Sequence, residues 1–292
     1  MASPTLRPRR SLLYVPASNT RALEKARTIA ADCLIIDLED AVLPEAKPAA
    51  RETALSIVRA GGFEKREVIV RVNALDTPWA SDDLAVLAAV GAPAILVPKV
   101  SQPEDLRRVT EVLDAHRAAP QLWAMMETAQ SILYAREIAA FGGRLAGFVV
   151  GTNDLAKELR CAHPADRAPM RMALQTCVLS ARAYGLAAID GVHINLDDEV
   201  GFMESCRQSR ALGFDGRSLI HPKQIAGANE IYAPSISELE AARRIVAAHK
   251  EAAAAGKAVV VVDGRLVEFL HVREAEHILA QADAIAALAA PP

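Results

Sequence analysis

The stretch AILVPKVSQPEDLRRVTEVLDAHRAAPQLWAMMET, residues 94–128, contains the unit from which the fold of this chain can be inferred. It begins with a short apolar run at Ala94–Val100 and ends with another at Gln121–Thr128. Between them, Pro103–His116 is rich in Leu, Glu and Arg at helical spacing. Both runs are continuously apolar rather than alternating, which is typical of parallel strands with two buried faces. The stretch therefore predicts a strand, a helix and a second, parallel strand.

The same unit recurs along most of the chain. Six further strands are predicted at Ser11–Ser18, Cys33–Asp40, Glu67–Asn73, Leu145–Gly151, Ala187–His193 and Phe214–His221. Helical segments between the strands are predicted at Thr20–Ala31, Ala80–Val90, Ser131–Phe141, Arg171–Tyr184 and Glu199–Leu212. Eight β-then-α units of about 26 residues each suit a strand, a helix and two short loops. They predict an α/β fold of the closed (β/α)8 TIM-barrel type. A doubly wound sheet is the runner-up, but no G-x-G-x-x-G follows any strand.

The pattern changes after His221, where Pro222 and Pro234 bracket a predicted connecting segment. Three further elements are predicted, namely a helix, a β-hairpin and a second helix, at Ser237–Ala254, Lys257–Phe269 and His271–Leu288. Ser237 is the expected N-cap, with Glu240 completing a capping box, and the hairpin is expected to turn at Asp263–Gly264. We therefore expect a catalytic barrel over residues 1–233. Residues 234–292 are expected to form a helix-hairpin-helix lid or oligomerisation arm.

Composition excludes several classes of function. The 33 basic and 36 acidic residues give a net charge of −3, which offers no attraction to nucleic acid or to an anionic membrane. Aromatic residues make up only 4%, so stacking platforms for single strands are not expected. The four cysteines form no C-x-x-C pair, which argues against disulfides and zinc. No apolar run reaches the length of a membrane span or of a signal sequence. We expect a cytoplasmic protein that binds a small molecule.

Polar side chains close seven of the eight predicted strands. They include Asp37, Glu39, Asp40, Arg71, Asn73, Lys99, Glu127, Asn153, Asp154, Asp190 and His221. In a barrel all these strand ends surround one mouth, where such enzymes hold their active sites. The sequence therefore predicts a polar site at the carboxyl end of the barrel.

Glu127 and Asp154 close neighbouring strands, which in a sheet lie about 5 Å apart. Flanked by Arg71 and Lys99, they can form an acid/base pair, a structural ion-pair network or a site for a hard cation. Magnesium takes one or two carboxylates together with water and substrate oxygens. Because no histidine cluster suggests zinc, an oxygen-ligated ion is the preferred interpretation.

A second acidic group, Asp37, Glu39 and Asp40, follows the second strand. Three acids together repel substrate carboxylates and phosphates, so we expect them to orient Arg71, Lys99 or a metal-bound water. His221 can either reach substrate or make a hydrogen bond that serves packing.

Eight segments resemble one known family. They are RRSLLYVPASNTRALEKA (9–26), ADCLIIDLEDAVLPEAKPAAR (31–51), VIVRVNALDTPW (68–79), ILVPKV (95–100), WAMMETA (123–129), GTNDLAKEL (151–159), AIDGVH (188–193) and GFDGRSLIHPKQI (213–225). In this order and spacing they resemble the citrate lyase beta-subunit-like lyases. That group includes malyl-CoA and citramalyl-CoA lyases, within the HpcH/HpaI aldolase superfamily. The resemblance spans about residues 10–285.

The resemblance implies a Mg²⁺-dependent carbon–carbon lyase. Its reaction would be retro-Claisen cleavage of a 3-hydroxyacyl-CoA thioester to an acyl-CoA and a 2-oxo acid, with CoA entering as part of the substrate. It also implies a homo-oligomer, a trimer or hexamer, whose C-terminal segment can cover a neighbour's site. The residues implied to bind metal or substrate are Glu127 and Asp154 (metal), with Arg71, Glu127, Lys25, Asn153 and His221 (substrate). Lys25 matches a residue that holds CoA phosphate, and Arg71 also counts as catalytic.

Three positions, in two parts of the chain, depart from the family pattern. Many relatives carry an acid/base aspartate in the C-terminal segment, followed by proline. Here Glu268 stands at the aspartate's position and Leu270 at the proline's. Glutamate can transfer the same proton if the loop adjusts, so Glu268 is a predicted catalytic residue. Asn19 replaces a basic residue beside the CoA phosphates. The alternatives are a CoA-independent aldolase, a complex-dependent citrate lyase beta subunit, and a thioesterase activity of the same site.

Overall fold

The computed structural model describes residues 6–256 and 259–290, in which the chain forms two compact units. One is Arg9–Tyr232; the other combines the residues before Arg9 with those from Ala233 onward. Within the described ranges, no helix is both long and apolar enough to cross a membrane.

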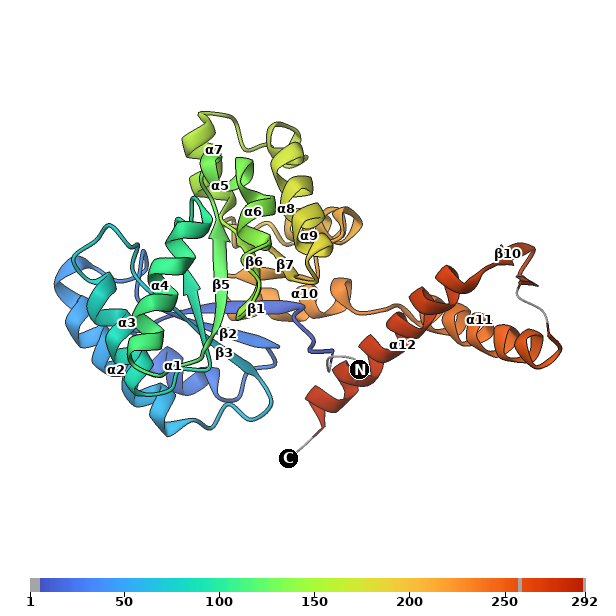
Figure 1. Cartoon of the computed structure of the whole chain (residues 1–292), viewed down its shortest axis with the longest axis horizontal. Coiled ribbons are helices and arrows are strands. Elements are labelled where there is room, and N and C mark those ends of the chain that lie inside the picture. The colour runs from blue at the N-terminus through green and yellow to red at the C-terminus, as the bar shows by residue number, and fades with distance from the viewer. Residues whose placement is uncertain (1–5, 257–258, 291–292) are drawn as a thin grey trace. The chain divides into compact units, whose positions relative to one another are not determined.

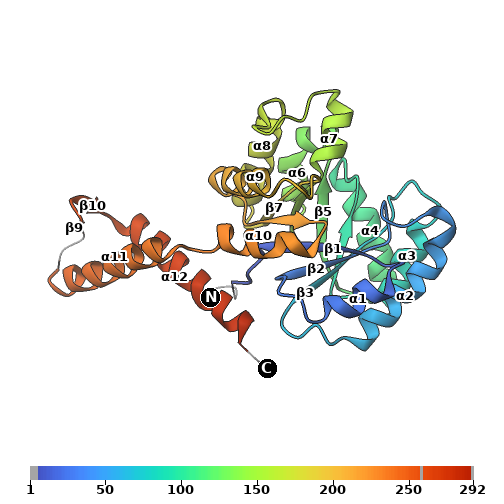
Figure 2. The ribbon, with the colours of Figure 1, turned by 180° about the vertical axis from the view of Figure 1, so that it is seen from behind.

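Eight parallel strands close into a barrel in the order of the sequence, with β1 pairing to both β2 and β8. The strands are β1 (Ser11–Pro16), β2 (Cys33–Asp37), β3 (Glu67–Arg71), β4 (Ala94–Val97), β5 (Gln121–Met126), β6 (Leu145–Val150), β7 (Ala187–Asp190) and β8 (Gly216–Leu219). Figures 1 and 2 show the helices packed around these strands. The predicted TIM barrel is confirmed, and each strand ends one to three residues earlier than predicted.

Helices connect successive strands. They are α1 (Thr20–Ala26), α2 (Lys47–Ala60), α3 (Ala80–Ala89), α4 (Pro103–Ala115), α5 (Ala129–Leu133), α6 (Ala135–Ala139), α7 (Thr152–Leu159), α8 (Arg171–Ala183), α9 (Glu199–Leu212) and α10 (Ile225–Tyr232). Short 3-10 turns lie at Pro44–Ala46, Ala168–Met170 and Pro222–Gln224. The single helix predicted at Ser131–Phe141 is wrong, because the chain forms two short helices separated at Tyr134. The sequence analysis did not identify α2, α7 and α10; the last of these, which follows β8, lies in a stretch predicted as a connecting segment.

Alternation along the strands divides the apolar residues into two layers. Cys33, Ile35 and Ile69 belong to a small cluster inside the barrel, whereas Leu34 and Val70 belong to the larger layer under the helices. Successive side chains on a strand point to opposite faces. This parity therefore decides which strand-end side chains enter the barrel mouth.

The C-terminal unit contains α11 (Ile236–Ala254), β9 (Val260–Val262), β10 (Arg265–Val267) and α12 (Phe269–Ala289). The two strands are antiparallel, and both Asp263 and Gly264 have positive φ angles, 51° and 77°. Such angles are those of a type I′ hairpin turn, so the predicted turn is confirmed. Lys257 and Ala258, also part of the predicted hairpin, lie outside the described residues.

The predicted cap of α11 is wrong by two residues. Ser235 caps the helix by accepting a hydrogen bond from the backbone N–H of Glu238 at 3.2 Å. The Glu238 carboxylate accepts from the backbone N–H of Ser235 at 2.7 Å, which completes the capping box. The sequence SISELE offers the same motif twice, and the earlier one adds two residues to the helix.

Candidate active site

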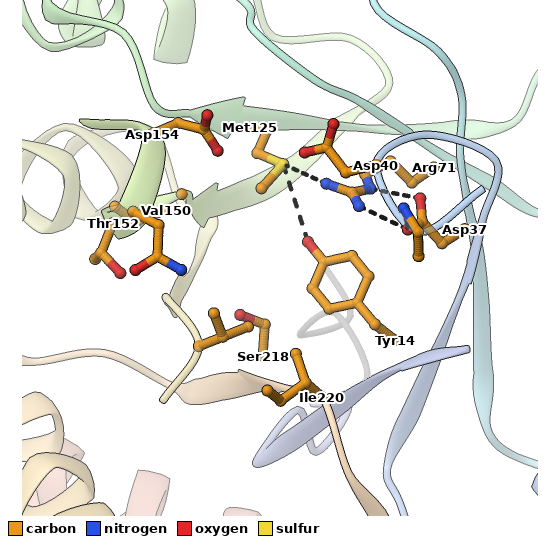
Figure 3. A pocket seen from close by; sticks show the side chains of 14 residues that line it. Tyr14, Asp37, Asp40, Arg71, Met125, Val150, Thr152, Asp154, Ser218 and Ile220 are labelled. Carbon is orange, nitrogen blue, oxygen red and sulfur yellow. Dashed lines mark hydrogen bonds and ion pairs between the residues drawn. The ribbon is translucent and has the colours of Figure 1, made fainter. Parts of the chain in front are cut away.

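A cavity of about 330 Å³ lies at the carboxyl ends of the barrel strands (Figure 3). It is lined by Tyr14, Asp37, Asp40, Ala41, Arg71, Met125, Val150, Gly151, Thr152, Asn153, Asp154, Val192, Ser218 and Ile220. Charged groups of both signs and apolar side chains therefore line one cavity. This is the usual location of active sites in the fold.

Arg71 is fixed from three sides. Asp37 accepts two hydrogen bonds from it, from Nε and from Nη2, each at 2.7 Å. Oε2 of Glu39 lies 2.8 Å from Nη1, and the guanidinium carbon lies 4.8 Å from the centre of the Tyr14 ring. Burial opposes the charge, but Asp37 outweighs it and the pKa of Arg71 is raised above its ordinary value. The guanidinium is thus a permanent, oriented cation.

Lys99 connects the acidic group to Glu127. It adopts a left-handed backbone conformation, with φ of 52°, two residues after the end of β4. Its backbone N–H donates to Oε1 of Glu127 at 2.8 Å, and its Nζ donates to Oε1 of Glu39 at 2.9 Å. Asp37 and Glu39 thus hold Arg71 and Lys99, as the sequence predicted, while Asp40 lines the cavity.

Glu127 is almost fully buried directly after β5, with 2% of its surface exposed. Burial, assisted by the charge of Glu39, raises the pKa of its carboxyl to about 8. A Cβ atom on Gly151 would lie 2.2 Å from Oε2 of Glu127. Gly151 therefore leaves the space that the carboxylate occupies, and no larger residue fits there without moving it.

Asp154 comes from the first turn of α7 rather than from the end of a strand. It is half-buried and lines the cavity together with Asn153. Among residues 6–256 and 259–290, no group of three or more His, Cys, Asp and Glu side chains is arranged to hold a metal. Two carboxylates nevertheless fit magnesium, which keeps several water or substrate oxygens in its shell. The negative charge of Asp154 also acts on the Glu127 carboxyl and helps to raise its pKa, as expected of two acids near one cation site.

Four predicted site residues lie outside the cavity lining, and one of them is Glu127, described above. Lys25 is exposed in the last turn of α1. His221 is exposed, and its Nδ1 accepts a hydrogen bond from the backbone N–H of Lys223 at 3.1 Å, which caps the turn at Pro222–Gln224. Glu268 is exposed at the N-cap of α12 in the C-terminal unit.

Asp190 was expected at the mouth, and this prediction is wrong. It is the last residue of β7, and its side chain belongs to the set that points away from the barrel interior. It binds Arg167 at 2.6 and 2.8 Å and lies 3.7 Å from Arg217, away from the cavity lining. Because Ile189 points into the barrel, its neighbour Asp190 must point out.

The sequence analysis missed Tyr14 and Ser218 as cavity residues. Tyr14 lies within an apolar run and carries no strand-end signal. Ser218 shares a strand with Arg217, and its hydroxyl donates to the backbone carbonyl of Asp190 at 2.9 Å. Strand parity identifies both, since Tyr14 is two residues after the interior Leu12.

Comparison with known proteins gives one family. The sequence model described as HpcH/HpaI aldolase/citrate lyase matches residues 10–222. A (3S)-malyl-CoA thioesterase of Cereibacter sphaeroides is 49% identical over 97% of this chain and 98% of its own length. The citrate lyase subunit beta of Escherichia coli is 33% identical over 95% of this chain and 94% of its own length.

A solved structure adds ligands to this comparison. The protein CitE of Mycobacterium tuberculosis, in complex with magnesium, acetoacetate and coenzyme A, superimposes with a TM-score of 0.78 at 31% identity. The match covers 94% of this chain and 97% of that one. Homologues of this chain therefore bind magnesium and coenzyme A.

Proposed function

The chain belongs to the HpcH/HpaI aldolase/citrate lyase family, and from that premise we propose that it is a magnesium-dependent thioesterase for a malyl-type 3-hydroxyacyl-CoA. The observation that carries the proposal is the cavity in which Asp154 and the fixed cation Arg71 meet, with Glu127 beside it. The 49% identity to a (3S)-malyl-CoA thioesterase, over nearly the whole of both chains, favours hydrolysis among the reactions this site can support.

Glu127 and Asp154 would hold the magnesium ion. When bound, the ion supplies a Lewis acid that chelates the carboxylate and hydroxyl oxygens of the substrate. Asn153 would bind the same end of the substrate from the cavity wall. Lys25 would pair with a phosphate of CoA, and His221, whose Nε2 is not used in its capping bond, would bind an outer part of the substrate.

Arg71 would stabilise the negative charge that develops on the thioester oxygen. In hydrolysis, a water oxygen bonds to the carbonyl carbon, the carbon–sulfur bond breaks and the thiolate takes a proton. In retro-Claisen cleavage, the C3 hydroxyl loses its proton and becomes the carbonyl of the 2-oxo acid, while the bond between C2 and C3 breaks. Its electrons form an enolate on the same thioester oxygen, and C2 then takes a proton. Both routes place negative charge where a buried guanidinium is most effective.

Carbon–carbon cleavage to an acyl-CoA and a 2-oxo acid is the second candidate. The full-length similarity to a citrate lyase subunit beta favours it. The two reactions share the substrate and the charge pattern, so their products must separate them. A CoA-independent aldolase or a subunit that requires partner chains would give neither product from the free thioester.

Glu268 would act as acid or base from the C-terminal unit, as a lid over its own site or a neighbour's. Exposed apolar side chains in that unit, Leu266, Phe269 and Leu270, support a role in contacts within a homo-oligomer, a trimer or hexamer, in the cytoplasm. We expect Glu268→Gln to lower kcat by about a hundredfold or more with little change in KM, since general acid–base catalysis supplies such factors. An unchanged kcat would remove Glu268 from the mechanism.

The decisive experiment follows free thiol and 2-oxo acid in parallel from malyl-, citramalyl- and citryl-CoA, with Mg²⁺. Free thiol without oxo acid supports the thioesterase, and oxo acid without free thiol supports the lyase. Silence on all three substrates contradicts both. Glu127→Ala and Asp154→Ala should each abolish turnover and its response to Mg²⁺, and full activity in EDTA would refute the metal assignment.

A further inference from the structure

Two hydrogen-bond donors converge on one weak acceptor at the edge of the cavity. The Tyr14 hydroxyl lies 3.9 Å from Sδ of Met125, and Nη1 of Arg71 lies 3.7 Å from the same sulfur atom. Figure 3 shows both contacts as dashed lines that meet at Met125. A thioether sulfur accepts hydrogen bonds only weakly. Nη1 carries two hydrogens and also lies 2.8 Å from Oε2 of Glu39, so one hydrogen serves Glu39 and the other is directed at Met125. The structure thus places a neutral and a charged donor together at one weak acceptor.

Tyr14 is suited to donate. Within the described part of the chain, Met125 is the sole hydrogen-bond partner of its hydroxyl. Burial raises the pKa of Tyr14 well above its ordinary value, so the hydroxyl stays protonated at neutral pH. The ring also packs 4.8 Å below the guanidinium of Arg71, which fixes the two donors relative to each other.

We propose that the Tyr14 hydroxyl and Nη1 of Arg71 donate together to one substrate oxygen, and that this oxygen is the thioester carbonyl. The inference rests on the proposed function, because it requires a thioester in the cavity. The substrate's carboxylate and hydroxyl are assigned to the side of Glu127 and Asp154. The carbonyl is the remaining oxygen that gains negative charge during either reaction. Tyr14 would then be a further catalytic residue.

The proposal predicts different losses in the ground state and in the transition state. A neutral hydrogen bond to a carbonyl contributes about two- to tenfold to binding. A donor to a developing oxyanion contributes more, because removing one costs about a hundred- to a thousandfold in kcat. Because Arg71 remains in the variant, we expect Tyr14→Phe to lower kcat by about ten- to a hundredfold.

The binding test pairs this variant with two ligands that differ only at the carbonyl. Acetyl-CoA carries the thioester oxygen, and S-ethyl-CoA has a methylene group in its place. Titration calorimetry with Mg²⁺ should show that Tyr14→Phe weakens the binding of acetyl-CoA by about two- to tenfold. The affinity for S-ethyl-CoA should not change. Phenylalanine preserves the packing on Arg71, so an unchanged melting temperature separates the lost hydroxyl from misfolding. Tyr134→Phe, at an exposed tyrosine between α5 and α6, is the matched control and should change neither ligand.

If Tyr14→Phe weakens the binding of both ligands equally, or does not weaken the binding of acetyl-CoA, the inference is overturned. If the wild type still hydrolyses or cleaves malyl-CoA in that case, the proposed function stands without it. If the wild type has no activity but the carbonyl-specific loss is seen, the two-donor site stands and the proposed reaction fails. An absence of acetyl-CoA binding by the wild type would overturn both.

Discussion

Two clusters of buried arginine and carboxylate lie at the ends of barrel strands, and they differ in what surrounds them. In the inner cluster, Asp37 at the end of β2 holds Arg71 beside the cavity. In the outer cluster, Asp190 at the end of β7 holds Arg167 and lies 3.7 Å from Arg217, under the helices. Both acids are 1% exposed or less. Burial and ion pairing are therefore shared, and only the direction of the side chain distinguishes a site from a structural network.

The difference follows from the parity of the strands. Asp37 follows Cys33 and Ile35 at even steps, and these two side chains fill the barrel interior. Asp190 stands one step after the interior residue Ile189. A one-residue change in register would exchange the two faces, so the same residue types acquire different functions from their position alone. Strong electrostatic perturbation marks both clusters, and by itself it does not identify a functional site.

The largest expected effect separates stability from catalysis in the outer cluster. Asp190→Asn leaves two buried arginines without their counter-charge, and such losses cost about 3–5 kcal/mol of folding free energy. Urea unfolding measures this loss, and kcat per folded molecule should stay at the wild-type value. A variant that is stable but inactive would contradict the distinction between the two clusters.

The same variant has a defined pH dependence. Burial alone would raise the pKa of Asp190, but Arg217 and Arg167 outweigh it and the pKa is lowered overall. A lowered folded-state pKa contributes stability above the unfolded value of about 3.9, which is lost as the pH falls through the folded-state value. The stability difference between wild type and Asp190→Asn should therefore shrink as the pH falls below about 4.

The second expected effect is a loss of catalysis in the inner cluster, in contrast to the loss of stability expected in the outer cluster. Arg71→Lys keeps the positive charge but loses the planar group that binds Asp37 twice, so kcat should fall by about a hundred- to a thousandfold. The matched control is Arg167→Lys in the outer cluster, which should retain kcat and lose stability. Measuring kcat and the free energy of unfolding for both variants gives the comparison directly. Equal effects of the two substitutions on kcat would refute it.

The sequence predicted the barrel and its eight strands, because apolar runs are local signals, and it predicted that Arg71 and Asp154 lie at the mouth of the barrel. It placed Asp190 at the mouth, since a pattern of continuously apolar strands does not show which face each residue occupies. It missed Tyr14 for the same reason. Which residues of each strand face the barrel interior became clear only from the structure, in which the interior layer is separate from the helix-facing layer.

A third, smaller effect concerns a residue that acts on the inner cluster from outside the cavity. Nζ of Lys47, in a side chain that is 6% exposed, donates to the carbonyl oxygens of Leu38 and Glu39 at 2.9 and 3.0 Å. These bonds hold the segment that aims Glu39 at Arg71. We expect Lys47→Met to lower kcat about tenfold with little change in KM, because small misplacements of catalytic groups slow the chemical step.

The control for Lys47 is Lys157→Met, at an exposed lysine on α7. It should leave kcat and KM unchanged. A loss of stability in Lys47→Met without any change in kcat would assign Lys47 to folding alone.

The smallest effect tests whether the outer cluster influences the mouth at all. Nη1 of Arg217 donates to Oγ of Ser205 at 2.9 Å, on the helix-facing side of β8. Ser205→Ala removes one acceptor from a buried guanidinium that still has Asp190 nearby, so the free energy of unfolding should fall by about 1 kcal/mol. If the two clusters are independent, their effects add and kcat stays at the wild-type value. A fall in kcat at unchanged stability would mean that the strand transmits the disturbance from Arg217 to its neighbour Ser218 in the cavity. The face of the strand to which a side chain points would then not be enough to distinguish the catalytic cluster from the structural one.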